Sequence, residues 1–341
     1  MMLYIYPMKI SEIIAQLESF APPAFQESYD NAGLLTGDAN EECTGALVTL
    51  DSTEEVIREA IRKNCNLVVA HHPIIFRGLK TITGKNYVER AVITAIRNDV
   101  AIYAIHTNLD NVLNGVSGKM AEVLGLKNVN VLSFRENTLK KLFTFVPIEN
   151  AEQVRKAIFD AGGGNIGKYS QCSFNMDGSG TFMAKEGADP YIGEVGKPTT
   201  TREMKIEIVF PAYLENKIVD AMLSAHPYEE VAYDVVALSN NYQLAGSGVI
   251  AEIEEPMSET NFLQHLKDRF ELQTIRHTPF LEKPVKRVAI CGGAGSFLIP
   301  KALSAGADVF VTSDVKYHEF FDAEGKMLVA DIGHFESEQF T

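Results

Sequence analysis

The chain has 341 residues, of which 46% are hydrophobic and 22% are charged, a composition typical of a globular protein with room for two domains. Its 45 acidic and 31 basic residues give a net charge of −14, which repels phosphate backbones and argues against direct nucleic-acid binding. No run of roughly 18 or more uncharged apolar residues occurs, so a membrane protein is not expected.

The start of the chain, MMLYIYPMKI, lacks the basic region and the small-residue cleavage site of a signal peptide, and we interpret it as an extended segment. The four cysteines lie far apart without a CxxC pair, as a reducing compartment permits. We therefore expect a cytoplasmic protein.

Residues 45–78 predict a strand, a helix and a second strand, because the apolar spacing changes from continuous runs to a helical period and back. Residues 286–321 repeat this plan. Each segment is followed by another buried strand that ends in polar residues, at 99–110 and at 326–338. We therefore expect two related α/β halves whose strands end at one crevice, which is where open α/β sheets bind ligands.

Residues 135–244 differ from the sequence on either side of them. Their predicted order is β-α-β, a glycine-rich loop with short strands, and β-α-β, which is the order of a ferredoxin-like sandwich. We interpret this segment as an inserted α+β domain. Residues 1–134 and 245–341 would then form one discontinuous α/β domain.

Two adjacent histidines, His71 and His72, follow a buried strand and precede Pro73. The residue before a proline is held extended, and successive side chains of an extended chain point to opposite sides. Each imidazole can therefore serve one of two metal ions. A lone histidine is more often an incidental surface or core residue, but the pair at a strand end favours metal binding.

Further metal-ligand candidates follow the other strands. His106 and Asp110 lie in HTNLD, where Asp110 is the better ligand candidate, although a polar loop with a helix cap also explains this segment. His334 and Glu338 are four residues apart, so in a helix that starts after Gly333 they share one face. The position of this pair, after a strand of the second half, is what favours metal ligation over chance.

Three histidines and two carboxylates predict a site for two divalent ions, and they suit Zn²⁺, Fe²⁺, Mn²⁺, Co²⁺ or Ni²⁺ better than Ca²⁺ or Mg²⁺. Paired ions acidify water and stabilise an oxygen that gains charge, which indicates metal-assisted hydrolysis. Asp314 and His318 end a strand in the same region. Together with His106 they are candidates for acid/base or supporting roles.

Two glycine-rich segments invite other interpretations. GGGNIGKY, from Gly162, resembles a P-loop, but Tyr169 stands where a serine or threonine would reach the metal, so we do not expect nucleotide hydrolysis there. CGGAGS, at 291–296, follows a strand and opens a helix. Its backbone amides are suited to an anion, and a plain tight turn explains it equally well.

The motifs YDNAGLLTGD, HHPIIF, HTNLD, TSDVKYHEF and DIGHFESE occur in this order. In them the chain closely resembles the Nif-three-like family, also named GTP cyclohydrolase I type 2-like or dinuclear metal centre hexameric proteins. AGGGNIGKYSQCSF and HPYEEVAYDV resemble the PII-like insertion of its longer members. The resemblance covers nearly the whole chain, and it implies a toroidal homohexamer whose metal sites face an internal cavity.

The resemblance also implies a role for each candidate ligand. His71 and Asp110 match the ligands of one ion, His72 and His334 match those of the other, and Glu338 matches the bridging carboxylate. Longer members continue after this position with a further helix, whereas three residues follow it here. If the chain ends there, the last helix is short and holds its carboxylate less firmly.

Two functions of different classes follow. One is a metal-dependent hydrolase that acts on a nucleotide or a related cyclic amidine or phosphate compound, since the family's name refers to ring opening of GTP by metal-activated water. The other is a non-catalytic metal-binding or regulatory ring whose PII-like domain senses a small ligand or a partner. The native metal and the substrate stay open.

Overall fold

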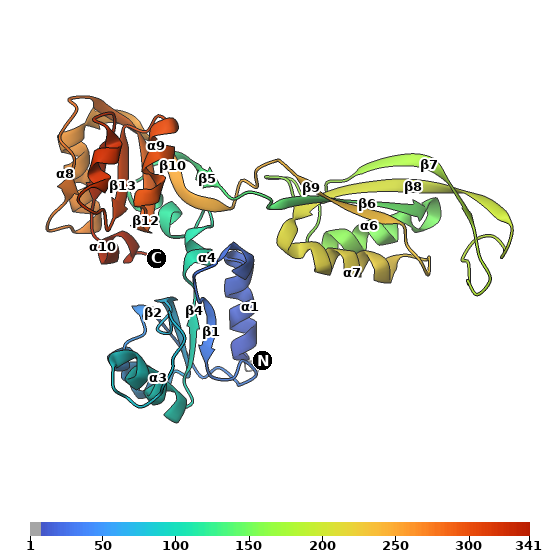
Figure 1. Ribbon diagram of the computed structural model, residues 1–341, viewed down its shortest axis with the longest axis horizontal. Coiled ribbons are helices and arrows are strands. Elements are labelled where there is room, and N and C mark those ends of the chain that lie inside the picture. Colours follow the sequence, from blue (N-terminus) through green and yellow to red (C-terminus); the bar gives the residue numbers. More distant parts are fainter. Residues whose placement is uncertain (1–7) are drawn as a thin grey trace, which may run out of the picture. The chain divides into compact units, whose positions relative to one another are not determined.

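The computed structural model describes residues 8–341, so the extended start predicted for the chain lies almost entirely outside the described residues. The chain divides into two compact units (Figure 1). The first unit comprises the described residues up to Phe134 together with Leu244–Thr341, and the second unit comprises Arg135–Gln243. None of the helices in the described residues has the length and apolar character that crossing a bilayer requires.

The first sheet of the first unit has the strand order β1-β4-β3-β2. Strands β2, β3 and β4 are parallel, and β1 pairs with β4 in the antiparallel direction. In chain order the elements of this part are α1 (Ile10–Phe20), η1 (Pro23–Phe25), β1 (Gly33–Thr36), β2 (Ala46–Asp51), α2 (Glu54–Arg62), β3 (Leu67–His72), α3 (Tyr87–Arg97), β4 (Ala101–Ala104), α4 (Thr107–Asp110) and α5 (Val116–Val123).

Local sequence explains the predicted β2-α2-β3 unit. Thr53 caps α2, because its hydroxyl accepts a hydrogen bond from the Val56 amide at 3.4 Å. The apolar face of α2, with Ile57 and Ala60, packs in a core that also contains Val68 of β3. The strand β3 is buried along its length, as expected of a central parallel strand.

The second sheet of the first unit has the strand order β11-β14-β13-β12-β10-β5. Its strands β12, β13 and β14 are parallel, and β11 pairs antiparallel with β14 just as β1 pairs with β4. Its elements are β5 (Lys127–Phe134), β10 (Gly246–Ser258), α8 (Glu259–Phe270), β11 (Arg276–His277), β12 (Pro284–Ala294), η4 (Ser296–Leu298), α9 (Ile299–Ser304), β13 (Val309–Ser313), η5 (Glu319–Ala323), β14 (Leu328–Asp331) and α10 (His334–Glu338).

The predicted α/β class with two related halves is confirmed by this shared strand pattern. Two differences separate the halves. The short η5 turn, not an α-helix, connects β13 to β14, and β10 and β5 extend the second sheet beyond β12. Helix α5 links the sheets, since Met120 and Ala121 lie in the core of the second sheet although they follow the first in the chain.

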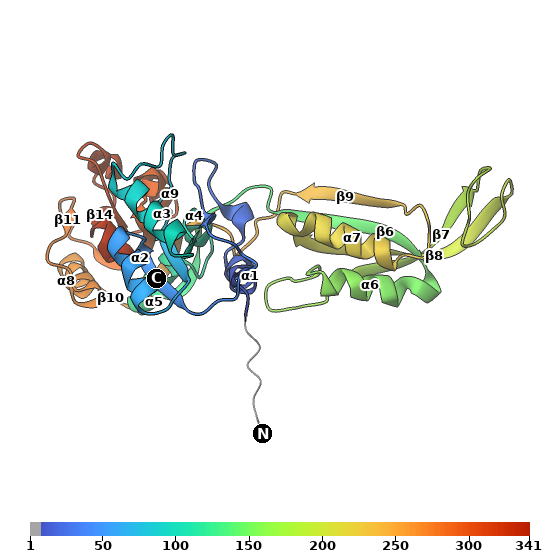
Figure 2. The ribbon, with the colours of Figure 1, turned by 90° about the horizontal axis from the view of Figure 1, so that it is seen from below.

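The second unit has the strand order β7-β8-β6-β9, with every neighbouring pair antiparallel. The core between sheet and helices contains Ile158 of α6 and Met222 of α7, so both helices cover one face (Figure 2). This is the predicted ferredoxin-like order, whereas the likeness to PII stays a prediction. The elements are β6 (Leu139–Pro147), η2 (Ile148–Asn150), α6 (Ala151–Asp160), β7 (Phe174–Met183), β8 (Pro198–Pro211), η3 (Ala212–Leu214), α7 (Glu215–Ala225) and β9 (Tyr233–Leu238).

Candidate metal centre

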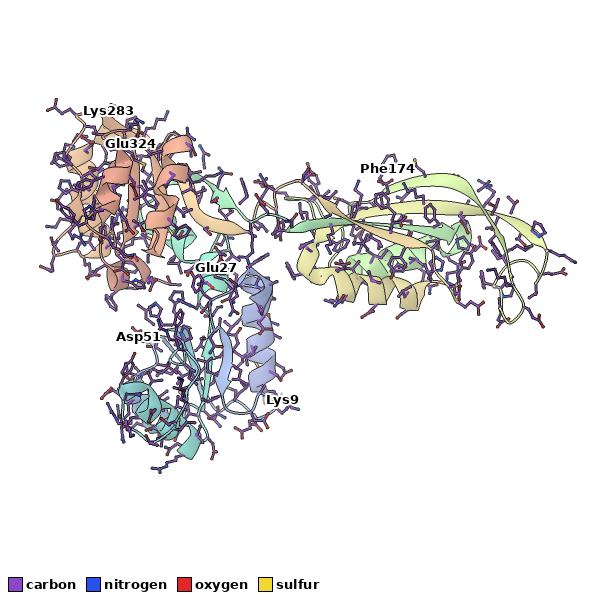
Figure 3. All side chains as sticks on the ribbon, viewed as in Figure 1. Lys9, Glu27, Asp51, Phe174, Lys283 and Glu324 are labelled. Carbon is purple, nitrogen blue, oxygen red and sulfur yellow. The ribbon has the colours of Figure 1, made fainter. Side chains whose placement is uncertain are left out.

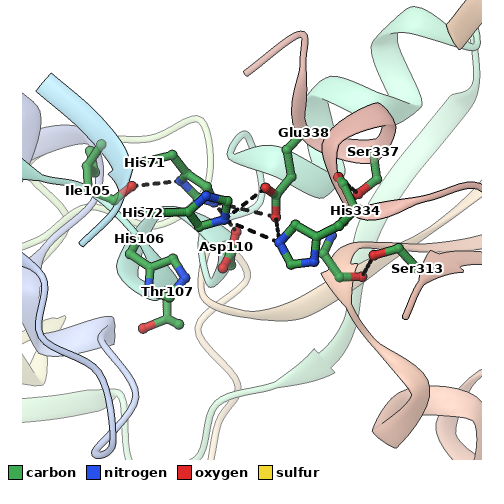
Figure 4. A network of polar contacts seen from close by, with 12 residues as sticks. His71, His72, Ile105, His106, Thr107, Asp110, Ser313, His334, Ser337 and Glu338 are labelled. Atoms are coloured by element: carbon green, nitrogen blue, oxygen red, sulfur yellow. Dashed lines mark hydrogen bonds and ion pairs between the residues drawn. The ribbon is translucent and has the colours of Figure 1, made fainter. Parts of the chain in front are cut away.

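The five side chains predicted as metal ligands lie together within the first unit (Figure 4). His71 and His72 are the last two residues of β3, and Asp110 is the last residue of α4. His334 and Glu338 are the first and last residues of α10, the helix predicted to start after Gly333. The strand ends of both sheets therefore contribute to one cluster.

The carboxylate of Glu338, which is 2% exposed, lies at the centre of this cluster. Its Oε1 lies 3.2 Å from Nε2 of His334 and 3.6 Å from Nε2 of His71. Its Oε2 lies 3.1 Å from Nε2 of His72. Asp110 completes the group, with Oδ1 3.7 Å from Nε2 of His71. One carboxylate thus faces imidazoles from both sheets.

Each of these three imidazoles is held from outside the cluster through its Nδ1 atom. The acceptors are the Ile105 carbonyl for His71 at 2.8 Å, the Asp51 carboxylate for His72 at 3.0 Å and the Asp314 carboxylate for His334 at 2.7 Å. These oxygens only accept, so Nδ1 carries a proton and Nε2 faces the cluster, where its lone pair can bind a cation once any second proton has left. Such outer partners, among them Asp51 at the end of β2 (Figure 3), are typical of metal-binding histidines.

The cluster fits divalent cations because its inner atoms are otherwise unsatisfied. Within the described part of the chain, Nε2 of His71, Oδ1 of Asp110 and Oε2 of Glu338 are buried without a hydrogen-bond partner. Native proteins rarely leave buried polar atoms in this state. Moreover, the Nε2 atoms of His72 and His334 approach to 3.2 Å, so without a cation one of them must hold a proton for the other to accept. Cations between these atoms would satisfy them all.

Electrostatics within the cluster show what holds it together when no metal is bound. The hydrogen bond to Glu338 raises the pKa of His334 to about 9. Burial opposes ionisation of Glu338, but the facing imidazoles of His334, His71 and His72 outweigh it and hold the pKa of that carboxyl far below its usual range. Burial raises the pKa of Asp110 to about 6. Protons and divalent cations therefore compete for the same atoms.

His106 lies beside the cluster, with its ring centroid 5.3 Å from that of His71 and 5.5 Å from that of His72. Its Nδ1 is held by Oδ1 of Asp30 at 2.7 Å. Burial opposes ionisation of Asp30, but hydrogen bonds from His106 and Thr107 lower its pKa to about 2. Asp30 was not predicted as a site residue, and its place in the YDNAGLLTGD motif was the only sequence signal for it.

Of the two other residues predicted to support the chemistry, the structure brings one to the cluster. Asp314, at the end of β13, orients His334 as described. His318 is exposed, and its ring lies against Tyr317 and Phe321, with centroid distances of 5.0 and 5.9 Å. The acid/base role predicted for His318 therefore stays a prediction without geometric support.

The CGGAGS segment borders the cluster through Gly293. This residue has φ of +63°, and a Cβ atom there would lie 2.7 Å from Oε1 of Glu338. Its amide donates to Oγ of Ser337 at 2.9 Å, and the Gly292 amide donates to Oγ of Ser117 at 3.2 Å. Because hydroxyls of the chain use these amides, the geometry favours the tight-turn interpretation over the anion site.

We expect Gly293→Ala to weaken metal binding about tenfold, because the added methyl group displaces the Glu338 carboxylate. It should also lower the free energy of unfolding by about 1 kcal/mol, since alanine is strained at positive φ. Gly125→Ala is the matched control, because Gly125 has φ of +71° and open space around it. Metal titration of both variants tests this, and equal metal affinities would contradict the close approach.

Known proteins are similar to this chain over nearly its whole length. A profile of the family described as Duf34/NIF3 (NGG1p interacting factor 3) matches residues 8–341. A Bacillus subtilis protein named GTP cyclohydrolase 1 type 2 homolog is 40% identical over 326 residues, which cover 95% of this chain and 87% of the relative. A protein of the same name from Halalkalibacterium halodurans is 42% identical over 333 residues, covering 96% and 89%.

Solved structures show the same relationship. A Bacillus cereus protein related to NIF3 has a TM-score of 0.87 and 40% sequence identity, covering 97% of this chain and 90% of its own. A Staphylococcus aureus protein has a TM-score of 0.76 and 31% identity, covering 97% and 88%. The similarity therefore extends over both units.

Proposed function

This chain belongs to the Duf34/NIF3 family, and we propose that it is a metal-dependent hydrolase with a dinuclear centre. One ion would be held by His71 and Asp110 and the other by His72 and His334, with Glu338 as a ligand shared between them. The set of buried, unpartnered nitrogen and oxygen atoms at the cluster carries the proposal. Their N and O chemistry suits Zn²⁺, Fe²⁺, Mn²⁺, Co²⁺ or Ni²⁺.

Two neighbouring divalent ions, when bound, would supply an acidified water and would stabilise an oxygen that gains charge in hydrolysis. The residues of the chain orient the imidazoles of the cluster and move protons. Asp51 and Asp314 fix the rings of His72 and His334, so that their Nε2 lone pairs stay directed inward. His106 bonds through Nδ1 to an ionised carboxylate, which leaves its Nε2 to hold a proton or deliver one to a leaving group.

A cavity of about 580 Å³ opens beside the cluster, and the residues that line it favour a phosphorylated substrate. Asp51 and His72 line it next to the centre, and the segment after β3 contributes Phe76, Arg77 and Lys80. Guanidinium and ammonium groups bind phosphate, and an aromatic ring offers a surface for a base. Glu89 also lines the cavity, but its carboxylate already accepts hydrogen bonds from backbone amides. Arg77 and Lys80 therefore favour a small anionic ligand such as a nucleotide, in a chain of net charge −14.

GTP is the first substrate to test, given the name of the relatives. We expect metal-loaded protein to open the guanine ring and release formate, and His72→Ala to release none, because the variant loses an imidazole of the cluster. His277→Ala is the control, since His277 is an exposed histidine stacked on Phe280. A formate assay of the wild type and both variants measures this release. Equal release from His72→Ala, or none from the wild type, would contradict a cyclohydrolase.

A second candidate function is a non-catalytic metal-binding or regulatory ring. It is favoured by a separate cavity of about 1030 Å³ in the second unit, which offers a place for a sensed ligand. This function predicts a homohexamer by light scattering and tight metal retention without turnover across a broad panel of substrates. Metal-dependent turnover of any one compound would refute it.

A further inference from the structure

The cavity of the second unit lies between the β7-β8 hairpin and the segment that follows α7. We propose that it binds an organic cation, namely a protonated amine or a guanidinium group attached to an apolar chain. One of its walls comes from the HPYEEVAYDV segment, which has no part in the metal centre. The proposal is independent of the activity proposed for that centre.

The cavity contains a buried carboxylate. Glu203 of β8 is only 8% exposed, and its Oε1 accepts a hydrogen bond from the Tyr228 hydroxyl at 2.7 Å. On the neighbouring strand β7, a Cβ atom at Gly180 would overlap Oε2 of Glu203. Glycine at this position therefore leaves room for the carboxylate. One hydroxyl does not balance a buried charge, whereas a cation that also donates hydrogen bonds does.

Aromatic rings stand around this carboxylate. The ring centroid of Tyr228 lies 6.3 Å from that of Phe182 and 6.2 Å from that of Tyr191. All three side chains line the cavity together with Glu203. The faces of aromatic rings attract ammonium and guanidinium groups, and they also bury the apolar chain that carries such a group.

The backbone at Tyr228 is fixed in place by the nearby side chain of His226. The Tyr228 amide donates to Nδ1 of His226 at 3.1 Å, so Nε2 carries the ring proton and donates to the Phe145 carbonyl at 3.1 Å. His226 is 8% exposed, and burial lowers its pKa, which keeps it neutral at pH 7. A wall held in this way is formed before a ligand arrives, as small-molecule sites usually are.

The charge of the lining selects a cation over an anion. The acidic residues that line the cavity are Asp177, Glu186, Glu203, Glu229 and Glu230, and the basic ones are Lys185 and Lys205. The ammonium group of Lys205 already pairs with Glu207 at 2.8 Å, and Asp177 pairs with Arg202 at 3.4 Å, which leaves four carboxylates beside Lys185. The remaining field is therefore negative, and phosphate or carboxylate ligands are disfavoured.

Calorimetric titration of the full, metal-loaded chain with butylguanidinium tests the proposal. Butylurea has nearly the same shape without the charge, so we expect it to bind at least about tenfold more weakly. Glu203→Gln should weaken butylguanidinium binding by at least about tenfold. Glu215→Gln, on α7 and outside the cavity lining, should bind like the wild type.

A second variant keeps the test valid if Glu203→Gln folds poorly. Tyr191 is 52% exposed, so Tyr191→Ala removes an aromatic wall without opening the core, and we expect binding to weaken several-fold. Equal binding of butylguanidinium and butylurea, or unchanged binding by both variants, would overturn the proposal. A third result would also overturn it: MgCl₂ releases binding heat, Glu203→Gln abolishes that heat, and butylguanidinium releases none. A metal ion would then be the occupant.

Discussion

Glu338→Gln should reduce the metal content from two ions to one or none per chain and lower hydrolytic turnover by at least about 100-fold. The carboxylate faces His71, His72 and His334 with both oxygens. An amide of the same shape replaces one of these oxygens with a donor. That donor bonds to an Nε2 lone pair and competes with the cation for it. Elemental analysis and turnover of the purified variant measure both effects.

Glu336→Gln is the matched control for this prediction. Glu336 belongs to the same helix, α10, but its carboxylate lies near Gly333 and takes no part in the cluster. Its metal content and turnover should equal those of the wild type. Two ions retained in Glu338→Gln would rule out the proposed shared carboxylate, whatever the activity.

Removing the metal with a chelator should lower thermal stability, and the loss should grow between about pH 6.5 and 9. In the metal-free protein the pKa of His334 is raised from 6.5 to about 9, so its stabilisation is complete below pH 6.5 and disappears as the pH rises through 9. The His334 side chain is 38% exposed, and solvent screening leaves this contribution on the order of 1 kcal/mol. Asp110 also makes a contribution to stability that is lost as the pH rises, but at lower pH, since its pKa is raised from 3.8 to about 6.

Bound metal changes this trend, because a cation held by His334 must displace the proton that this side chain otherwise carries and therefore binds more tightly as the pH rises. At a free metal concentration of about 1,000 times Kd, each ion stabilises the chain by about 4 kcal/mol. Melting curves of loaded and chelated protein between pH 6 and 9.5 should therefore diverge. His334→Asn should reduce the slope of the chelated form, and the raised pKa of His71 accounts for the remainder. Parallel curves for both forms would contradict proton competition at this site.

Local sequence was sufficient for the elements that carry the site. The change of apolar period over residues 45–78 predicted β2, α2 and β3, and the i, i+4 spacing of His334 and Glu338 after Gly333 predicted α10. The α/β class and the family were also predictable, since buried strands alternate with helices and five motifs follow in order. These features depend on residues close together in the chain, which is why the sequence reveals them.

The partners of the histidines were decided by tertiary structure. His72 and His334 meet although 262 positions separate them, and Asp30 supports His106 from 76 positions away. No periodic pattern records such pairs, because they depend on how α5 and the strand ends pack the two sheets together. The sequence placed His318 and Asp314 in one strand-end motif, yet the fold turns only Asp314 toward the cluster. Local periodicity thus determined which elements form, and long-range packing determined which side chains lie within bonding distance.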